Sequence, residues 1–178
     1  MTALPSRRLA VLRHAKSAWP DDVADHERPL AARGRRDAPA AGRRLREMGC
    51  APGLVVCSTA RRTRQTWDLV APELAASPPV VHDPRVYDAT VPELLNVIRE
   101  VPDRVETLLL IGHNPGAQEL VLRLAGEAAD DALQQARVKF PTAAIAVLTW
   151  QGTWSALAPG TARLTDFAIP RGLRGAKP

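Results

Sequence analysis

One stretch near the N-terminus carries most of the information about fold and chemistry: Leu9-Ala10-Val11-Leu12-Arg13-His14-Ala15-Lys16-Ser17. Its first four residues form a continuous apolar run, which is typical of a strand covered by helices on both faces. The residues that follow are small or ionisable. The stretch therefore predicts a buried strand that ends in a group of chemically active side chains.

Two further apolar runs, Leu54-Val55-Val56-Cys57 and Leu108-Leu109-Leu110-Ile111, predict buried strands of the same kind, and Pro79-Val80-Val81-His82 predicts a shorter one. Helical patterns separate the runs, and such alternation is typical of βαβ units with a parallel sheet. We therefore expect a three-layer α/β/α sandwich around a mostly parallel central sheet.

Apolar residues spaced three or four apart predict helices at 38–48, 63–74, 94–101 and 120–124. Pro72 should end the second of these helices early. Thr90 and Glu93 form a capping-box pattern ahead of the third helix. Asn114 and Pro115 are expected to open the fourth, as its N-cap and first helical residue.

The C-terminal part predicts one antiparallel strand. Residues 143–149, the turn Gln151-Gly152 and residues 153–157 are interpreted as a β-hairpin. We expect residues 1–178 to form one domain, with a core at about residues 8–158 and a loose C-terminal tail at 166–178.

The composition is typical of a globular protein, since 46% of the 178 residues are hydrophobic and 24% are charged. No uncharged apolar run approaches the roughly 18 residues that cross a bilayer, and the N-terminus lacks the apolar core of a signal peptide. Cys50 and Cys57 form no CxxC pattern. We therefore expect reduced thiols, a cytoplasmic location and no membrane partner.

The net charge of +5 is uneven, because the excess of arginine lies within residues 1–64. A nucleic-acid binder is one explanation, but the chain has only four tryptophans, one tyrosine and two phenylalanines for base stacking. The alternative is a compositional bias together with an anion site, since guanidinium offers two parallel N–H donors to phosphate. We expect no nucleic-acid partner.

A polar cluster follows each of the three long apolar runs. Arg13 and His14 follow the first, Arg62 lies after the second, and His113 and Asn114 follow the third. In an open parallel sheet the ligand crevice lies beyond the carboxyl ends of the strands, so these residues are expected to meet. Nearby helix N-termini would add backbone donors. The expected ligand is an anion, most simply phosphate, and a sulfate ion would suit the same donors.

The two histidines add chemistry to this anion site. An imidazole can attack phosphorus and carry the phosphoryl group, which divides one displacement into two steps. Neighbouring arginines disfavour the imidazolium, so the attacking nitrogen stays free at neutral pH. The arginines and the second histidine would bind the equatorial oxygens of the transition state. This scheme needs no metal and no cofactor.

The same residues resemble the signatures of a known family. Three blocks resemble those of the histidine phosphatase superfamily: Arg13-His14-Ala15-Lys16-Ser17, Ser58-x-x-x-Arg62-Thr63-x-Gln65-Thr66 and Gly112-His113-Asn114-Pro115. With Arg28-Pro29-Leu30-x-x-Arg33-Gly34, the first block looks most like the small SixA-type phosphohistidine phosphatases. The resemblance implies that His14 is the nucleophile and that Arg13, Arg62 and His113 complete the phosphate pocket.

The sequence gives a less specific signal for three further candidate site residues. Ser17 matches a position that often contacts phosphate in relatives, although its hydroxyl could instead cap a turn. Asn114 would contribute a ligand contact mainly through its backbone. Asp88 falls near the place where larger relatives carry their proton donor. The acidic residues at positions 21, 22, 25 and 27 could reach the rim of the site, but a solvated loop is the more frequent outcome.

The sequence departs from the family pattern at two places. Ala15 replaces the usual glycine, which is a mild change if its φ is negative. Pro20 stands where related mutases carry asparagine, which argues against mutase activity. Larger members also insert a helical segment over the site, whereas the short connection between Arg62 and Leu110 predicts an open pocket.

These observations predict a phosphatase with a covalent phosphohistidine intermediate on His14, acting on a phosphohistidine-bearing protein. A broad-specificity phosphomonoesterase acting on small phosphorylated substrates and a non-catalytic module for phosphate or phosphopeptides are the alternatives. His26 and His82 lie at no metal-ligand spacing, and no HExxH, paired CxxC, GxGxxG or P-loop motif is present. We therefore expect no zinc and no nucleotide cofactor.

Overall fold

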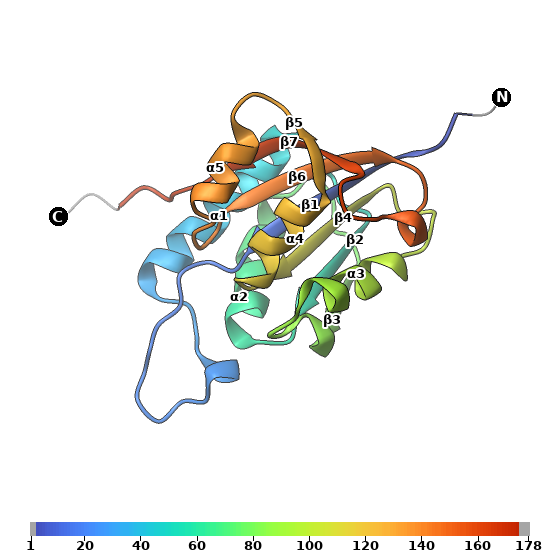
Figure 1. The fold of residues 1–178 in the computed structure, drawn as a ribbon. Coiled ribbons are helices and arrows are strands. Elements are labelled where there is room, and N and C mark those ends of the chain that lie inside the picture. The colour runs from blue at the N-terminus through green and yellow to red at the C-terminus, as the bar shows by residue number, and fades with distance from the viewer. Residues whose placement is uncertain (1–2, 175–178) are drawn as a thin grey trace.

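The computed structural model describes residues 3–174, which build one seven-stranded sheet with helices on both faces (Figure 1). The strand order is β3-β2-β4-β1-β6-β7-β5. The strands are β1 (Ser6–Arg13), β2 (Leu54–Ser58), β3 (Val80–Asp83), β4 (Thr107–Gly112), β5 (Ala125–Ala128), β6 (Ile145–Gln151) and β7 (Ala162–Ala168).

The sheet is mostly parallel, as expected from the apolar runs. Strands β1 to β4 pair in parallel, whereas β6 pairs antiparallel with both β1 and β7. The predicted partner of β6 was wrong: residues 153–157 contain a 3-10 turn, Trp154–Ala156, and the strand that pairs with β6 is β7. The buried Trp154 indole donates to the carbonyl oxygen of Val105 at 2.7 Å, which holds this segment against the β4 side of the molecule.

The helices form the outer layers of the predicted three-layer sandwich. Leu45 of α1 (Ala32–Glu47) and Trp67 of α2 (Arg61–Val70) pack with the buried side chains on one face of the sheet. On the other face lie α3 (Val91–Arg99), α4 (Gly116–Leu124) and α5 (Ala132–Val138). On β1, Leu9 packs in the core cluster of one face and Leu12 in the core cluster of the other, and both are fully buried, which confirms the strand covered on both faces.

The helix ends follow the sequence signals with one exception. Helix α2 ends at Val70, and Pro72 lies in the short 3-10 turn that follows. The capping box of Thr90 and Glu93 is present at α3. Asn114, however, is not the N-cap of α4, because the helix begins at Gly116 and Pro115 occupies the cap position. The Asn114 amide nitrogen instead donates to the carbonyl oxygen of Phe140 at 2.8 Å, which holds this residue outside the helix.

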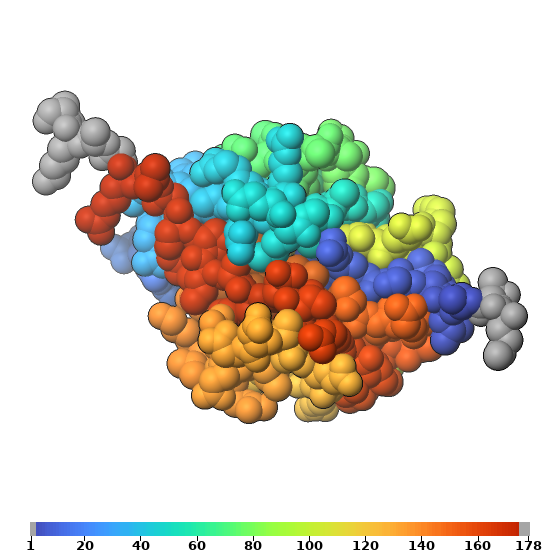
Figure 2. Space-filling model, turned by 90° about the horizontal axis from the view of Figure 1, so that it is seen from above, coloured from blue at the N-terminus to red at the C-terminus, as the bar shows by residue number. Residues whose placement is uncertain are grey.

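The expected loose tail at 166–178 was wrong for its first part. Residues 166–168 belong to β7, and the backbone N–H of Gly172 donates to the buried Asp37 carboxylate at 2.9 Å. Arg171 donates to the carbonyl oxygen of Thr142 at 3.0 Å. Figure 2 shows this red segment lying against the light-blue residues of α1. Residues 175–178 lie outside the described part of the chain.

Within residues 3–174, no helix is long and apolar enough to span a bilayer. Cys50 and Cys57 are both buried and form no disulfide.

Candidate active site

The carboxyl ends of β1, β2 and β4 place the predicted residues together. The register pairs Arg13 with Gly112, and the His14 backbone N–H donates to the carbonyl oxygen of Gly112 at 3.0 Å. His113 follows Gly112 directly, so the parallel pairing of β1 and β4 brings the two imidazoles side by side. Their ring centroids are 5.2 Å apart. The two histidines meet as the parallel-sheet argument predicts.

The His14 side chain is oriented by its own backbone. Its Nδ1 donates to the carbonyl oxygen of Ala15 at 2.7 Å, which fixes the proton on Nδ1 and leaves the lone pair on Nε2. Burial lowers the pKa of His14 to about 3, and the nearby His113 and Arg62 also lower it, whereas the bond to Ala15 opposes the shift. Nε2 is therefore unprotonated at neutral pH, which is the state that nucleophilic attack requires.

The His113 side chain is oriented by a different strand. Its Nε2 lies 2.7 Å from the Ser58 hydroxyl oxygen at the end of β2. Burial lowers the pKa of His113 to about 3, and the positive charge of Arg62 contributes. The buried Nδ1 has no hydrogen-bond partner within the described chain. His113 is thus a neutral imidazole with one unused ring nitrogen.

Two guanidinium groups complete the site. Arg13 donates to the carbonyl oxygen of Phe140 at 3.0 Å, and Arg62 donates to the Asp25 backbone oxygen at 2.7 Å and to its carboxylate at 3.1 Å. The buried Nε atoms of both arginines lack a partner among residues 3–174. Burial, and then the charge of Arg62, lower the pKa of Arg13. Crowded cations with unused donors are the electrostatic setting that a bound anion relieves.

Ser17 and Asn114 lie in the walls of the same site. Ser17 lines the pocket that contains His14, and its hydroxyl oxygen accepts a hydrogen bond from Arg28. Asn114 lines it too, but its amide is engaged by Phe140 on one side and by the Gln118 backbone N–H on the other. Its side chain is thus committed to the protein.

Asp88 lies in the wall of an adjoining pocket, together with His113 and Arg62. Its backbone has a φ of 53°, in the left-handed region that non-glycine residues seldom adopt. Asp22 and Asp130 adopt the same conformation, so the backbone of Asp88 does not by itself mark a functional residue. Asp88 thus lies beside two of the predicted phosphate ligands, and its chemical role is a proposal.

Sequence reasoning missed Tyr87 as part of the site and placed Asp25 among four acidic residues that were expected to lie in a solvated loop. Asp25 lies in the 3-10 turn Asp25–Glu27, within the blue loop that extends beyond β1 in Figure 1. The Tyr87 hydroxyl donates to the Asp25 carboxylate, and Arg28 donates to it at 2.9 Å. No local pattern marked this contact, because its two ends are 62 residues apart.

The environment of Asp25 favours its ionised form. The hydrogen bond from Tyr87 above all, together with those from Arg28 and Arg62, holds the pKa of this carboxyl well below its usual range, although burial opposes the shift. The same contact raises the pKa of Tyr87. Asp25 thus stays ionised and positions Arg62.

Two packing contacts explain other parts of the sequence signatures. The Ala15 backbone N–H donates to the Thr66 hydroxyl at 3.0 Å, and that hydroxyl donates to the Arg62 carbonyl oxygen at 2.7 Å. Thr66 therefore connects the loop of His14 to the helix of Arg62. A Cβ atom at Gly34 would collide with the carbonyl oxygen of Lys16, so only glycine lets α1 pack this closely against the His14 loop.

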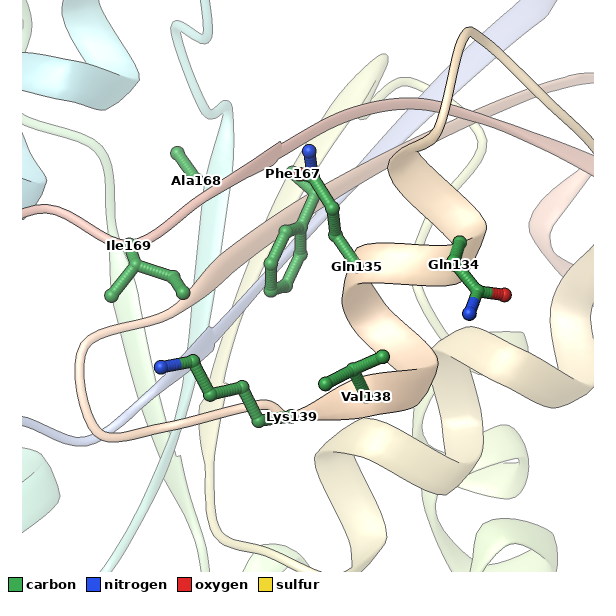
Figure 3. A pocket seen from close by; sticks show the side chains of 7 residues that line it. All are labelled: Gln134, Gln135, Val138, Lys139, Phe167, Ala168 and Ile169. Atoms are coloured by element: carbon green, nitrogen blue, oxygen red, sulfur yellow. The ribbon is translucent and has the colours of Figure 1, made fainter.

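The site pocket has a volume of about 210 Å³ and is shared by ten residues: Arg13, His14, Lys16, Ser17, Trp19, Arg28, Arg62, His113, Asn114 and Thr142. A separate apolar groove of about 370 Å³ lies between α5 and the end of β7, where Figure 3 shows Phe167 near Val138. This groove contains none of the predicted site residues. The polar pocket is therefore the candidate active site.

The fold and the site define an α/β protein with two neutral imidazoles and two guanidiniums around one anion-sized pocket. Residues 9–94 match the histidine phosphatase superfamily, branch 1. A SixA structure from Nakamurella multipartitia is 33% identical, with a TM-score of 0.84 over 95% of this chain and 99% of that one. The chain belongs to the histidine phosphatase superfamily and resembles its SixA-type phosphohistidine phosphatases.

Two further relatives extend the comparison. A SixA structure from Agrobacterium tumefaciens is 29% identical, with a TM-score of 0.78 over 94% of this chain and 100% of that one. An uncharacterized protein of Mycobacterium tuberculosis is 43% identical over 162 residues, which are 90% of this chain and 100% of the relative. Family membership supports a phosphatase activity.

Proposed function

We propose that this protein is a phosphatase that removes phosphoryl groups from phosphohistidine-bearing proteins through a covalent intermediate on His14. The observation that carries the proposal is the state of His14: its Nδ1 donates to the carbonyl oxygen of Ala15, and its Nε2 is unprotonated beside two guanidiniums. A nucleophile so placed in a cationic pocket suits attack on an anionic phosphoryl group.

The first half of the reaction forms a bond between His14 Nε2 and phosphorus. The lone pair of Nε2 attacks, the bond from phosphorus to the leaving nitrogen breaks, and its electron pair returns to the leaving imidazole. That imidazole then takes a proton. Asp88, beside His113 in the pocket wall, is the candidate donor, although a nitrogen leaving group is basic enough to take its proton from water.

The second half of the reaction restores the enzyme. Water attacks the phosphoryl group on His14, the bond between Nε2 and phosphorus breaks, and the lone pair returns to Nε2. One proton of the water molecule leaves with phosphate or passes to solvent. The reaction consumes one water molecule and needs neither a metal nor a redox partner.

Arg13, Arg62 and His113 would stabilise the phosphoryl oxygens as charge builds up on them. The unpartnered Nε atoms of the arginines and Nδ1 of His113 are consistent with this role. Ser17 and Asn114 lie in the walls of the same pocket. They would orient the bound phosphoryl group rather than carry the chemistry.

The open rim of the site favours a protein-borne substrate. Lys16 and Trp19 are exposed at the edge of the cavity of about 210 Å³ that contains His14. This cavity can accommodate a phosphoryl group while the molecule that bears it extends past the rim. This is the geometry expected when the phosphate is attached to a folded partner.

The decisive experiment mixes the enzyme rapidly with three substrates: a phosphohistidine protein, a phosphoserine peptide and a generic aryl phosphate. The wild type should release phosphate fastest from the phosphohistidine protein and form an acid-labile phosphoenzyme. His14→Ala should form none. Hydrolysis of the aryl phosphate alone would indicate a broad phosphomonoesterase, and tight phosphate binding without a phosphoenzyme would indicate a binding module.

A further inference from the structure

Trp19 is placed unlike the other tryptophans of the chain. Its relative exposure is 74%, whereas Trp67, Trp150 and Trp154 are buried at 7%, 6% and 0%. It lies five residues after His14 in the sequence and lines the pocket that contains His14. A large apolar side chain left in solvent at the edge of a catalytic pocket is a candidate contact for a ligand.

The indole is held in place from one side. The Arg28 guanidinium carbon lies 3.3 Å from the centroid of the Trp19 ring, in a cation–π contact. Arg28 is itself fixed, because it donates to the Ala18 carbonyl oxygen at 3.1 Å and to the Asp25 carboxylate at 2.9 Å. Arg28 is only 7% exposed. The ring is therefore positioned before any ligand binds.

The position of Trp19 relative to the phosphate ligands points to the leaving group. His14, Arg62 and His113 are at most 9% exposed and form the floor of the pocket, whereas Trp19 and Lys16 are its exposed lining residues. A phosphoryl group bound on the floor directs the rest of its substrate outward. The group that leaves phosphorus must pass the exposed rim.

We propose that Trp19 is a specificity-determining residue that packs against the planar ring of the leaving group, the imidazole of phosphohistidine. This inference rests on the proposed function, because it identifies the outer half of the same substrate. An imidazole can stack on indole and, once it carries a proton, gains a cation–π attraction. The serine side chain of a phosphoserine substrate has no ring and makes neither contact.

The test measures binding and turnover separately. Binding is measured in a His14→Ala background, which removes the nucleophile. The three ligands are inorganic phosphate, phosphoserine, and a triazole phosphonate that mimics phosphohistidine. Adding Trp19→Ala should raise the Kd of the triazole roughly five- to tenfold, the size of one aromatic contact. The Kd values of phosphoserine and inorganic phosphate should change less than about twofold. Trp19→Phe should retain most of the affinity for the triazole.

Turnover provides the second readout. With His14 intact, Trp19→Ala should lower the ratio of kcat/KM for phosphoimidazole to kcat/KM for phosphoserine by the same factor. The matched control is Val81→Ala, which alters an exposed apolar residue away from the pocket, on β3, and should leave the ratio unchanged. A parallel loss of affinity for all three ligands would overturn the proposal, since it would mean that Trp19 only supports Arg28.

The two proposals fail in different ways. An unchanged triazole Kd in the Trp19→Ala protein rejects the role of Trp19 and leaves the reaction on His14 untouched. A His14→Ala protein that still turns over phosphohistidine rejects the reaction, whereas the binding measurements on Trp19 keep their meaning.

Discussion

The loops after β1 and β4 each bring one histidine to the pocket, and they hold it in different ways. Both rings are almost completely buried, and the pKa of each is lowered to about 3. In the β1 loop, Nδ1 of His14 is bonded to the adjacent carbonyl oxygen of Ala15. In the β4 loop, Nε2 of His113 is paired with Ser58 on the neighbouring strand.

The difference shows that two similarly buried histidines can present different ring nitrogens to a ligand. A bond at Nδ1 leaves Nε2 of His14 free. A bond at Nε2 leaves His113 with Nδ1, which in the neutral tautomer protonated there is a hydrogen-bond donor. The proposed roles, nucleophile for His14 and oxyanion ligand for His113, follow from the nitrogen that each ring leaves free.

The largest expected effects on kcat come from removing each imidazole in turn. His14→Ala should lower kcat by at least about 10⁴-fold, because no other described group replaces the nucleophile. His113→Ala should lower it by about 10²–10³-fold, the usual effect of removing one preorganised donor. Quench-flow trapping should find no phosphoenzyme in the first variant and slow formation of it in the second. Equal phosphoenzyme levels in both variants would contradict the assigned roles.

Acid should destabilise the fold through both histidines. The unfolded imidazoles titrate near 6.5, but the folded pKa values are about 3, so the unfolded chain binds more protons between these values. Stability is therefore fully present above pH 6.5 and falls by up to about 1.4 kcal/mol per histidine for each pH unit below it. Urea denaturation from pH 7 to pH 4.5 measures the slope.

Matched variants show which histidine causes the loss of stability at low pH. His14→Gln should remove a large part of it, because the neutral amide does not titrate. His82→Gln, at an exposed position on β3, should leave it unchanged. A slope that persists in a His14→Gln, His113→Gln double variant would mean that other groups cause the acid sensitivity.

The smallest effect is expected from the hydroxyl that orients His113. Ser58→Ala removes the partner of Nε2 and should lower kcat/KM about five- to tenfold, the effect of one buried hydrogen bond of roughly 1 kcal/mol. Phosphoenzyme should still form, since His14 and its bond to Ala15 are unaffected. Wild-type kcat/KM with an unchanged melting temperature would show that His113 needs no such support.

The central sheet was predictable because its strands are buried on both faces. Continuous apolar runs at β1, β2 and β4 give a local signal, and the parallel-sheet rule then brings His14 to His113 without any knowledge of contacts. The short β5 and α5 carried no comparable pattern and were not predicted. The segment of Trp154 resembled a strand, although a buried indole hydrogen bond determines its conformation instead.

The parts of the site that escaped prediction depend on contacts between loops. Asp25 looked like one acidic residue among several in a solvated loop, and only the three-dimensional structure shows that Arg62, Arg28 and Tyr87 converge on it. Such a contact follows from tertiary packing and leaves no periodic trace in sequence. The arrangement of the cap at Asn114 was missed for the same reason, since Phe140 is distant along the chain.

The docked C-terminal segment affects how the protein should be tagged or immobilised. Arg171 is bonded to Thr142, and the next residue, Ala143, donates its backbone N–H to the carbonyl oxygens of Arg13 and His14. A fusion partner joined to the segment of Arg171 and Gly172 would therefore begin near the wall of the pocket. The start of β1 lies on the opposite side of the molecule (Figure 1), and coupling on that side leaves the pocket accessible.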